Sequence, residues 1–480
     1  MLNALVCHDW LLRRYYSHRR WVPARLLYHA DYFRVRRLLA GDVGDAGEPG
    51  ATAVAEAEAA QRLRHVLGTA AAHVPFYRRC VRLSKAQLAN EAPLALLQCF
   101  PVIDKAQVMA CQRDFLDERF DPRHLHYVTS GGSSGQGIGM WRSKRLADIE
   151  KAFFAHEWAR FGFCEHRSRT LRIGADARRL AHEGPTQVIG NRLMLSPYHL
   201  TAQHRAAIVD AIARFRPQYV HAYPSSAAAL AELIAPDRLR LQLQLQPGVR
   251  AVLLASEPAT QQQLAAIAGL FGCPISINYG LTERTGLAFA THWRGATGPY
   301  RFEPLYAVHE NLAAMHASNA TGARGASDAN ASREIVGTSL WNDLMPLIRY
   351  RSGDFGTLDA GGFCPTIDGR AQEFLLARDG TRIPGLSIVI DEATWDFVRL
   401  YQIRQNAAGA ITLCVVARAG RLSAAQKQFV LNAQLRRWGG WFDIGVEEVD
   451  DIPLAANGKR QLVVTKIVNE AVKNAVHDGS

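Results

Sequence analysis

Short apolar runs alternate with helical patterns through most of this chain, and that alternation constrains the fold more than any other feature. The runs with the length and character of buried strands are 128–130, 170–173, 219–222, 252–255 and 275–279. Helical patterns at 227–234 and 260–271 lie between some of them. Strands connected through helices pair mostly in parallel within one sheet. The sequence therefore predicts an α/β fold with a largely parallel sheet.

The 480 residues exceed what one ordinary core accommodates, which suits two domains, or one large domain and a small one. We predict a basic N-terminal helical extension over 1–50. A large α/β domain is expected over 51–370, beginning with an Ala-rich helix at 52–72. A small α+β domain is expected over 371–480.

Two regions depart from the strand–helix alternation. Residues 311–332 are small and polar without periodicity, and we predict a loop or insertion there. After residue 371 the pattern indicates a hairpin-like start, then a helix near 392–400, an apolar strand at 411–417 and a helix near 424–438. The second region is the small α+β domain.

The formal net charge of +12 suits a partner with negative charge, such as a nucleotide, coenzyme A, an anionic membrane or nucleic acid. A GC-rich genome that writes Arg for Lys explains the same balance without a ligand. The eight cysteines form no CxxC pair and no zinc-type spacing, so we expect reduced thiols in a cytoplasmic protein. Neither a signal peptide nor a membrane-spanning segment is indicated.

Residues 10–40 combine arginines with aromatic side chains, and two interpretations remain open. The segment could be a helical pair that lies on an anionic membrane as a peripheral contact. The interpretation that we favour is a pair of amphipathic helices that packs on the main domain and leaves its arginines in solvent.

A loop rich in glycine and hydroxyl groups follows the first apolar run, in the sequence Tyr127-Val-Thr-Ser-Gly-Gly-Ser-Ser-Gly-Gln-Gly137. Glycines let such a backbone turn and present its N–H groups, and hydroxyls add donors, so the loop can surround phosphates. Its candidate ligand-binding residues are Ser130, Gly132, Ser133, Ser134 and Gly135. Read alone, the segment is also what a merely flexible loop looks like.

The segment Asn278-Tyr-Gly-Leu-Thr-Glu283 ends an apolar strand, the place where α/β folds bind ligands. Tyr279 and Gly280 offer a ring and an open backbone, Thr282 a hydroxyl, and Glu283 a carboxylate able to hold Mg²⁺. The alternative is an ordinary strand–turn–helix junction with Thr or Glu as a cap.

Three further charged residues stand in short motifs. Asp354 follows a glycine in Ile348-Arg-Tyr-Arg-Ser-Gly-Asp354, where a carboxylate can accept both hydroxyls of a ribose. Arg370 ends Asp368-Gly-Arg370 and can bind ribose or phosphate in bidentate fashion. Lys459 follows an Asn-Gly turn. Singly, each is compatible with an ordinary surface charge.

In this order and spacing the five motifs resemble the adenylate-forming superfamily of acyl-CoA synthetases, adenylation domains and luciferases. The likeness is nearest to the phenylacetate-CoA ligase branch, including homologues linked to capsular polysaccharide genes. Segments that look like that branch are Val74-Pro-Phe-Tyr77, Ala222-Tyr-Pro-Ser-Ser226 and Ala255-Ser-Glu-Pro258. The resemblance covers roughly residues 60–470.

The resemblance implies that ATP and Mg²⁺ activate a carboxylic acid as an acyl-adenylate, with coenzyme A as the acyl acceptor. The 130–137 loop would surround the β- and γ-phosphates, while Tyr279 and Gly280 would lie against adenine and the acyl group. Thr282 would contact the α-phosphate and Glu283 would bind Mg²⁺.

By the same resemblance, Asp354 and Arg370 would hold the ribose, and Lys459 would bridge the α-phosphate and the carboxylate. The C-terminal domain would be mobile and rotate about a hinge after Arg370 between the two half-reactions.

This chain departs from the family pattern at two places. Gly135-Gln-Gly137 replaces a lysine-containing end of the phosphate loop, and Ala371-Gln-Glu373 occupies the hinge. A second hypothesis is therefore that the enzyme transfers the acyl group to a sugar, an amine or a carrier protein. A third hypothesis is a non-enzymatic binding protein on a decayed ligase scaffold.

We expect no nucleic-acid partner, and a homodimer is possible. Phe289 and Trp293 are candidates for the acyl pocket, or for the core.

Overall fold

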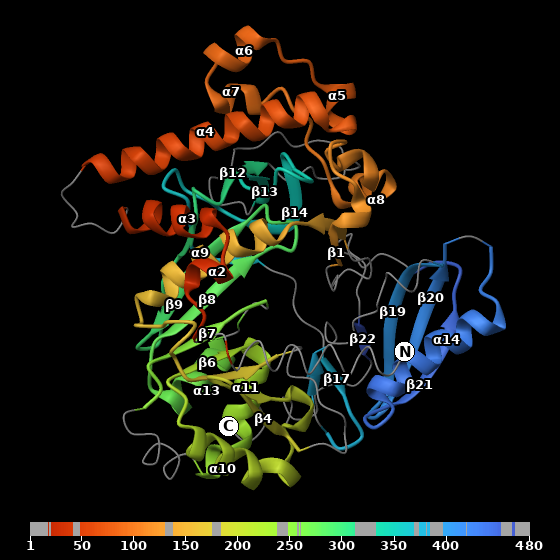
Figure 1. Ribbon diagram of the computed structural model, residues 1–480. Helices are drawn as coiled ribbons and strands as arrows, with labels where there is room; N and C mark the ends of the chain where they lie inside the picture. Colours follow the sequence, from red (N-terminus) through yellow and green to blue (C-terminus); the bar gives the residue numbers. More distant parts are fainter. Residues whose placement is uncertain are drawn as a thin grey trace, which may run out of the picture.

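The computed structural model describes residue 18 and residues 21–41, 49–129, 138–174, 184–237, 248–256, 259, 261–312, 333–368, 374–380, 382–384, 397–418, 420–452 and 463–465. Three sets of elements make up the fold: a helical N-terminal layer, a large central sheet with a smaller sheet beside it, and a C-terminal sheet (Figure 1). The architecture is mixed α/β, as predicted.

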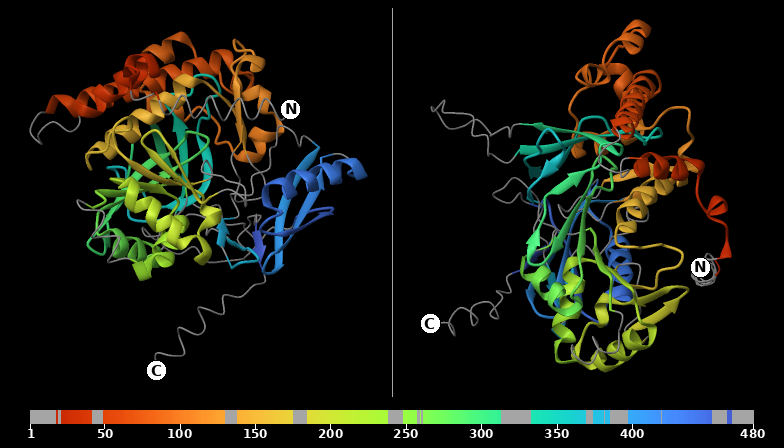
Figure 2. Two further views of the ribbon diagram at one scale, coloured as in Figure 1. Left: turned by 60° about the horizontal axis from the view of Figure 1, so that its bottom comes forward. Right: turned by 90° about the vertical axis from the view of Figure 1, so that its left-hand side faces the viewer.

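The N-terminal layer consists of α2 (Ala24–Leu27), α3 (Ala30–Gly41), α4 (Pro49–His73), α5 (Pro75–Cys80), α6 (Lys85–Asn90), α7 (Pro93–Leu97) and α8 (Lys105–Ala110). Ser84 and Asp104 begin α6 and α8 with capping boxes, in which each side chain accepts from the backbone three residues on. The long helix α4 confirms the helix predicted at 52–72. This layer and α10 (Arg205–Phe215) lie at opposite ends of the molecule (Figure 2).

Helices α2 and α3 pack on the main body, which supports the packed-helix interpretation for the described part of 10–40. Helix α3 runs against α9 (Lys144–Ala159). The Tyr28 hydroxyl donates to a Glu165 carboxylate oxygen at 2.7 Å. Arg145 of α9 pairs with Asp31 of α3 at 2.5 Å. No helix in the described part of the chain has the length and apolarity needed to cross a membrane.

The central sheet has the strand order β15-β11-β9-β8-β7-β6-β3-β5-β4, and β10 pairs with β9. Its parallel strands are β5 (Arg192–Leu195), β3 (Thr170–Ile173), β6 (Tyr219–Ala222), β7 (Ala251–Leu254) and β8 (Ile275–Gly280). The antiparallel strands are β4 (Thr186–Ile189), β9 (Leu287–Trp293), β10 (Ala296–Thr297), β11 (Tyr300–Phe302) and β15 (Phe363–Cys364). The centre of the sheet is parallel, and four of its strands begin at residues 170, 219, 251 and 275. Both observations confirm the sequence prediction.

Side-chain alternation gives the parallel strands two different faces. Leu171, Val220 and Val252 belong to an apolar core with α10, α11 (Pro224–Leu233) and α13 (Gln261–Phe271). Their neighbours Arg172 and His221 point to the opposite face, which α9 partly covers. One face is therefore a closed core, and the other is open to build a site.

A smaller antiparallel sheet lies beside β9 and β11. Its strands are β12 (Ala307–Leu312), β13 (Arg333–Ser339), β14 (Tyr350–Gly356) and β16 (Ile367–Asp368). The apolar run at 128–130 does not join the parallel sheet, because β1 (His126–Thr129) pairs with β2 (Gly139–Arg142) in a separate two-stranded sheet. That hairpin brackets the Gly/Ser-rich residues 130–137.

The C-terminal part has its own sheet, in the order β21-β20-β19-β22, and its own core. Its elements are β17 (Phe374–Leu376), β18 (Arg382–Pro384), β19 (Val398–Ala407), β20 (Ala410–Ala417), α14 (Ala424–Trp438), β21 (Asp443–Glu448) and β22 (Val463–Thr465). The hairpin start, the strand at 411–417 and the helix at 424–438 are confirmed.

The helix predicted near 392–400 is wrong over its last residues, because 398–407 form the strand β19. That strand pairs with β20 along almost its whole length, and this pairing outweighs the local helical pattern. The C-terminal part contacts the main body where β18 meets η5 (Pro197–His199). There the rings of His199 and Trp441 lie 5.5 Å apart.

Candidate active site

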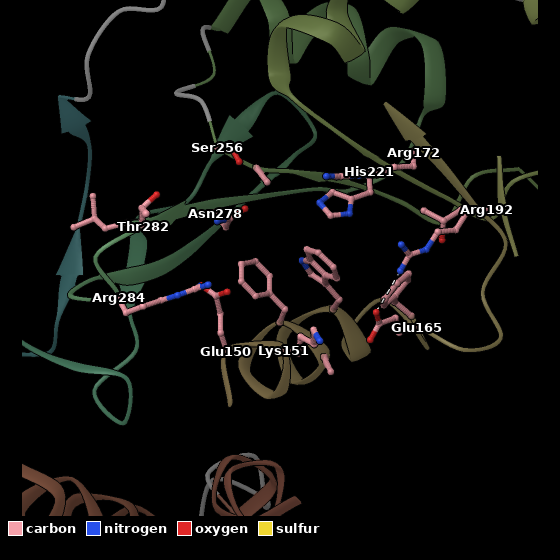
Figure 3. Close-up of a pocket in the computed structure, with 18 of the residues that line it drawn as sticks. Glu150, Lys151, Glu165, Arg172, Arg192, His221, Ser256, Asn278, Thr282 and Arg284 are labelled. Atoms are coloured by element: carbon pink, nitrogen blue, oxygen red, sulfur yellow. Dashed lines mark hydrogen bonds and ion pairs between the residues drawn. The ribbon is translucent and has the colours of Figure 1, made fainter. Parts of the chain in front are cut away.

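A cavity of about 420 Å³ opens on the α9 face of the central sheet. It extends from the carboxyl end of β8 across the sheet to β5, and it is lined by residues of β3, β6 and α9 (Figure 3). The crevice beyond the carboxyl ends of parallel strands is the usual ligand site of such sheets. Figure 3 shows Thr282 and Arg284 at one end and Arg172, Arg192 and Glu165 at the other, with His221 between them.

The backbone is strained at the Thr282 end. Ser256 follows β7 with φ +72°, and Arg284 follows Glu283 with φ +63°. Non-glycine residues rarely adopt this left-handed conformation, which costs on the order of 1–3 kcal/mol where neighbours enforce it. Both residues line the cavity. Strain of this kind concentrates at ligand sites, so this end of the cavity is a candidate site.

Two tyrosine–carboxylate hydrogen bonds join the β8 loop to β14. The Tyr279 hydroxyl donates to Asp354 Oδ2 at 3.0 Å, and the Tyr350 hydroxyl donates to Glu283 Oε1 at 2.9 Å. Burial, followed by the negative charge of Asp354, raises the pKa of Tyr279 well above its ordinary value. Tyr279 therefore stays a neutral donor that orients the carboxylate. Two motifs separated in the sequence form one polar cluster.

Two glycines make this cluster sterically feasible. Gly353 has φ +74°, a conformation that favours glycine and that turns the chain immediately before Asp354. A Cβ atom on Gly337 of β13 would lie 1.9 Å from the Thr285 carbonyl oxygen. The loop after β8 can therefore rest against β13 only because Gly337 has no side chain.

Two arginines with largely buried guanidinium groups fix the position of the loop after β8. The Arg142 guanidinium, on β2, donates to the Thr282 carbonyl oxygen, and Arg284 forms an ion pair with Glu150 of α9. Burial lowers the pKa of Arg142, and it lowers the pKa of Arg284 to about 10. Arg284, at least, remains charged at neutral pH. Because β2 follows the 130–137 segment, Arg142 also brings the end of that segment's hairpin to Thr282.

At the end of the cavity opposite Thr282, aromatic rings lie beside charged side chains. The Trp158 ring packs against His221 with centroids 4.9 Å apart and against Phe154 at 5.0 Å. Arg192 forms an ion pair with Glu165 at 3.3 Å. Burial, and then the charges of Arg172 and Arg192, lower the pKa of His221 well below its ordinary value of 6.5. The imidazole is therefore neutral at physiological pH.

The predicted site residues fall into two groups. Tyr279, Gly280, Thr282, Glu283 and Asp354 are described, and the structure brings them together around the β8 loop, with Gly280 and Thr282 lining the cavity. The other predicted residues lie outside the described part of the chain: Ser130, Gly132, Ser133, Ser134, Gly135, Arg370 and Lys459.

The sequence analysis missed the residues that line the far end of the cavity. Phe289 is core, in contact with Phe154, and Trp293 is 42% exposed, so neither lines the cavity. One signal was available: Arg172 and His221 each occupy the third position of a short apolar strand. A polar side chain within such a strand marks the face that is not closed by core.

Among the described residues, no group of three or more His, Cys, Asp or Glu is arranged to hold a metal ion. The seven cysteines within the described ranges form no disulfide with one another. His292 bonds Thr297 at 2.8 Å, and Cys273 is buried. A magnesium ion carried by ATP phosphates would need only one or two protein carboxylates. Glu283 fits that requirement, because Tyr350 holds one of its oxygens in place.

Comparison with known proteins gives two kinds of match. The family model described as AMP-binding enzyme matches residues 173–307, which run from β3 to the start of β12 and include Thr282 and Glu283. No curated protein matches the chain significantly.

Solved structures that are similar to this chain include a 2-hydroxyisobutyryl-CoA ligase in complex with 2-HIB-AMP and CoA. It is 17% identical over 90% of this chain and 94% of that chain, with a TM-score of 0.49. The amide bond synthetase McbA from Marinactinospora thermotolerans is 18% identical over 89% and 97%, with a TM-score of 0.36. The AMP-binding enzyme match therefore covers the part of the chain that forms the β8 loop and most of the strands that build the cavity.

Proposed function

We propose that this enzyme uses ATP to convert an aryl or acyl carboxylic acid into an acyl-adenylate and then transfers the acyl group to coenzyme A. A carboxylate oxygen of the acid attacks the α-phosphorus of ATP. The bond from that phosphorus to the oxygen bridging the β-phosphate breaks, and pyrophosphate leaves. The thiol of coenzyme A then displaces AMP from the acyl carbon.

The observation that carries this proposal is the polar cluster of Tyr279, Asp354, Tyr350 and Glu283 beside Thr282. Asp354 would accept the ribose hydroxyls, because Tyr279 already orients its carboxylate. Glu283 would hold Mg²⁺, which would neutralise phosphate charge when bound. Thr282 would donate to the α-phosphate. The ribose, the phosphate-bound Mg²⁺ and the α-phosphate would then each have a polar partner that is held in place before ATP binds.

Residues outside the described ranges complete the proposal. Ser130, Gly132, Ser133, Ser134 and Gly135 would surround the β- and γ-phosphates, from a segment whose hairpin ends beside Thr282. Arg370 would contact the ribose. Lys459 would bridge the α-phosphate and the carboxylate of the acid. The C-terminal part, 371–480, would rotate about a hinge after Arg370 and so switch the enzyme from adenylation to thioester formation.

Exchange of labelled pyrophosphate into ATP tests the first half-reaction directly. A panel of aryl and fatty acids should include at least one acid that makes exchange depend on both the acid and Mg²⁺. A folded enzyme that binds ATP but supports exchange with no acid would contradict the proposed activation.

Lys459→Ala should reduce acid-dependent pyrophosphate exchange by at least about 100-fold, since a cation that meets developing charge contributes several kcal/mol. ATP binding, measured by calorimetry, should change little. The matched control is Lys85→Ala, which removes an exposed lysine of α6. Equal exchange rates in the two variants would remove Lys459 from the reaction.

A second acceptor is the alternative for the final step. Gln136 and Gly137 replace a lysine-containing loop end, and Gln372 lies in the hinge, so the thioester half-reaction has less sequence support than adenylation. Mass analysis of products with coenzyme A, an amine, a sugar or a carrier protein separates the acceptors. Thioester formation as fast as adenylation would exclude the alternative.

A further inference from the structure

Asn278 places a polar side chain on the wall of the cavity, between apolar neighbours. It belongs to β8, where Ile275 and Ile277 face the closed core and Asn278 faces the opposite side. Its register partner on β9 is Phe289, whose ring lies 5.4 Å from that of Phe154 on α9. An apolar side chain would fit these neighbours without an unpaired polar group, so the amide calls for an explanation.

The Asn278 amide is enclosed, and part of it lacks a hydrogen bond. The residue is 8% exposed, and its Oδ1 atom has no hydrogen-bond partner in the described part of the chain. Its Nδ2 atom lies 3.5 Å from the position that a Cβ atom on Gly280 would occupy, and both residues line the cavity. A buried amide oxygen without a partner destabilises the folded state, and such groups are rare. We expect its partner to come from the cavity.

The chemistry of the amide selects that partner. An amide side chain offers an acceptor and a donor group, and rotation about its last bond exchanges the two. A hydroxyl group both donates and accepts, so it matches the amide in either orientation. An ammonium group would need a carboxylate to offset its desolvation. Glu150, the carboxylate at this end of the cavity, already binds Arg284 and accepts from the Tyr306 hydroxyl at 3.3 Å. The surroundings therefore favour a hydroxyl.

The two walls of the cavity differ in polarity. Figure 3 shows Asn278 and His221 on the strands and Glu150 on the facing helix. That helix, α9, also contributes the rings of Phe154 and Trp158 to the lining. A ligand can therefore lay its hydrocarbon part against α9 and point a hydroxyl toward the sheet.

Asn278 lies close to the reacting end of the cavity. It precedes Gly280 by two residues on the same face of β8, a distance of about 6.7 Å along the strand. Under the proposed function, the carboxylate of the acid reacts at Thr282, just beyond Gly280. A polar group bound at Asn278 therefore belongs to the acid, beside its carboxylate or within the width of one aromatic ring from it.

We propose that the acid carries a hydroxyl group and that Asn278 binds this hydroxyl. The enzyme then prefers a hydroxylated acid to the same acid without the hydroxyl, and Asn278 determines that specificity. The inference rests on the proposed function.

The test compares hydroxylated acids with their parents, for example the three hydroxybenzoates with benzoate and a series of hydroxyhexanoates with hexanoate. Acid-dependent pyrophosphate exchange is the measurement. We expect kcat/KM for the hydroxy acid to be at least about tenfold higher in the best pair, because a site that hydrogen-bonds a substrate hydroxyl discriminates against the analogue that lacks it.

The outcomes separate the two proposals. Exchange with every parent acid that equals or exceeds exchange with its hydroxylated forms overturns this inference and leaves the proposed function standing. Preference for aminobenzoates over hydroxybenzoates overturns the choice of a hydroxyl. Exchange with no acid of any series removes the proposed function, and the inference falls with it.

Asn278→Leu locates the discrimination. Leucine has a similar size but no hydrogen-bonding atom, so kcat/KM for the preferred hydroxy acid should fall at least about tenfold, with little change for the parent acid or in KM for ATP. Asn278→Ala should act in the same direction, which keeps the test valid if leucine packs poorly.

Ser276→Ala is the matched control. Ser276 is a buried polar residue on the same face of β8, and it is not among the described residues that line the cavity. This variant should retain the preference for the hydroxy acid. Equal losses for the hydroxy acid and its parent in both Asn278 variants would overturn the assignment.

Discussion

At the scale of single residues, the site depends on carboxylates that are oriented before any ligand arrives. Asp354 is 9% exposed and receives the Tyr279 hydrogen bond, and Glu283 is equally enclosed and receives that of Tyr350. A carboxylate held in this way loses little conformational freedom when it binds a ribose or a cation. Such preorganisation is what makes an electrostatic site effective.

Under the proposed function, Asp354→Asn should raise KM for ATP by at least about tenfold, because the ribose hydroxyls would lose a charged acceptor. The Tyr279 hydrogen bond can persist to the amide oxygen, so the fold should be retained. Steady-state exchange at varied ATP provides the measurement. Asp359→Asn is the control: Asp359 caps a surface turn by accepting from the backbone of Gly361 at 2.8 Å, and Asn can do the same. Similar ATP affinities in both variants would argue against a ribose contact.

At the scale of elements, α9 connects the N-terminal layer with the cavity. Its Glu150 side chain binds Arg284 at the site, while Arg145, nearer its N-terminus, pairs with Asp31 of α3 at 2.5 Å and with Asp343 at 2.7 Å. Burial would raise the pKa of Asp31, but the Arg145 hydrogen bond and charge hold it below its ordinary value of 3.8. The docking of α3 therefore keeps its full strength above about pH 4 and weakens below it.

Arg145→Gln should cost about 1–3 kcal/mol of unfolding free energy, because two partly buried carboxylates lose their shared guanidinium partner. The urea midpoint of unfolding should fall, and trypsin should cut sooner within α3. Arg123→Gln is the matched control, since Arg123 is 85% exposed and pairs with the neighbouring Asp121. That exposed pair should contribute less than about 1 kcal/mol. Equal shifts for the two variants would contradict a bridging role for Arg145.

At the scale of the whole molecule, the fold encloses histidines in their neutral form. His221 lines the cavity with a pKa well below 6.5, and burial lowers the pKa of His309 to about 3. His309 packs on the Phe302 ring at 4.6 Å, and its Nε2 atom is enclosed. Because the unfolded chain protonates both rings below about pH 6.5, the folded state loses stability as the pH falls through that value.

Unfolding free energy should therefore decrease from pH 7.5 to pH 5.5, by up to about 1.4 kcal/mol per pH unit below pH 6.5 for each enclosed histidine. Urea titrations at several pH values provide the slope. His309→Gln keeps a polar side chain that does not titrate, and it should remove one histidine's share of the slope. A flat profile, or an unchanged slope in the variant, would show that these rings protonate in the folded protein.

Prediction from sequence succeeded where the signal was local and failed where it depended on distant partners. The strands 170–173 and 219–222 and the helix 424–438 were located from their apolar patterns. The strand 398–407 was read as the end of a helix, because its pairing with 410–417 was not visible in its own pattern. The far end of the cavity was missed because the covering helix α9 decides which strand face stays open.

The sequence by itself determined the segments of the central sheet and the set of residue types suited to ATP, since both are written within a few neighbouring residues. Tertiary structure alone decided how those residues cooperate. Tyr279 and Asp354 are 75 residues apart, and Tyr350 and Glu283 are 67 apart, yet each pair is hydrogen-bonded. Contacts of this kind arise from packing, which local patterns do not specify.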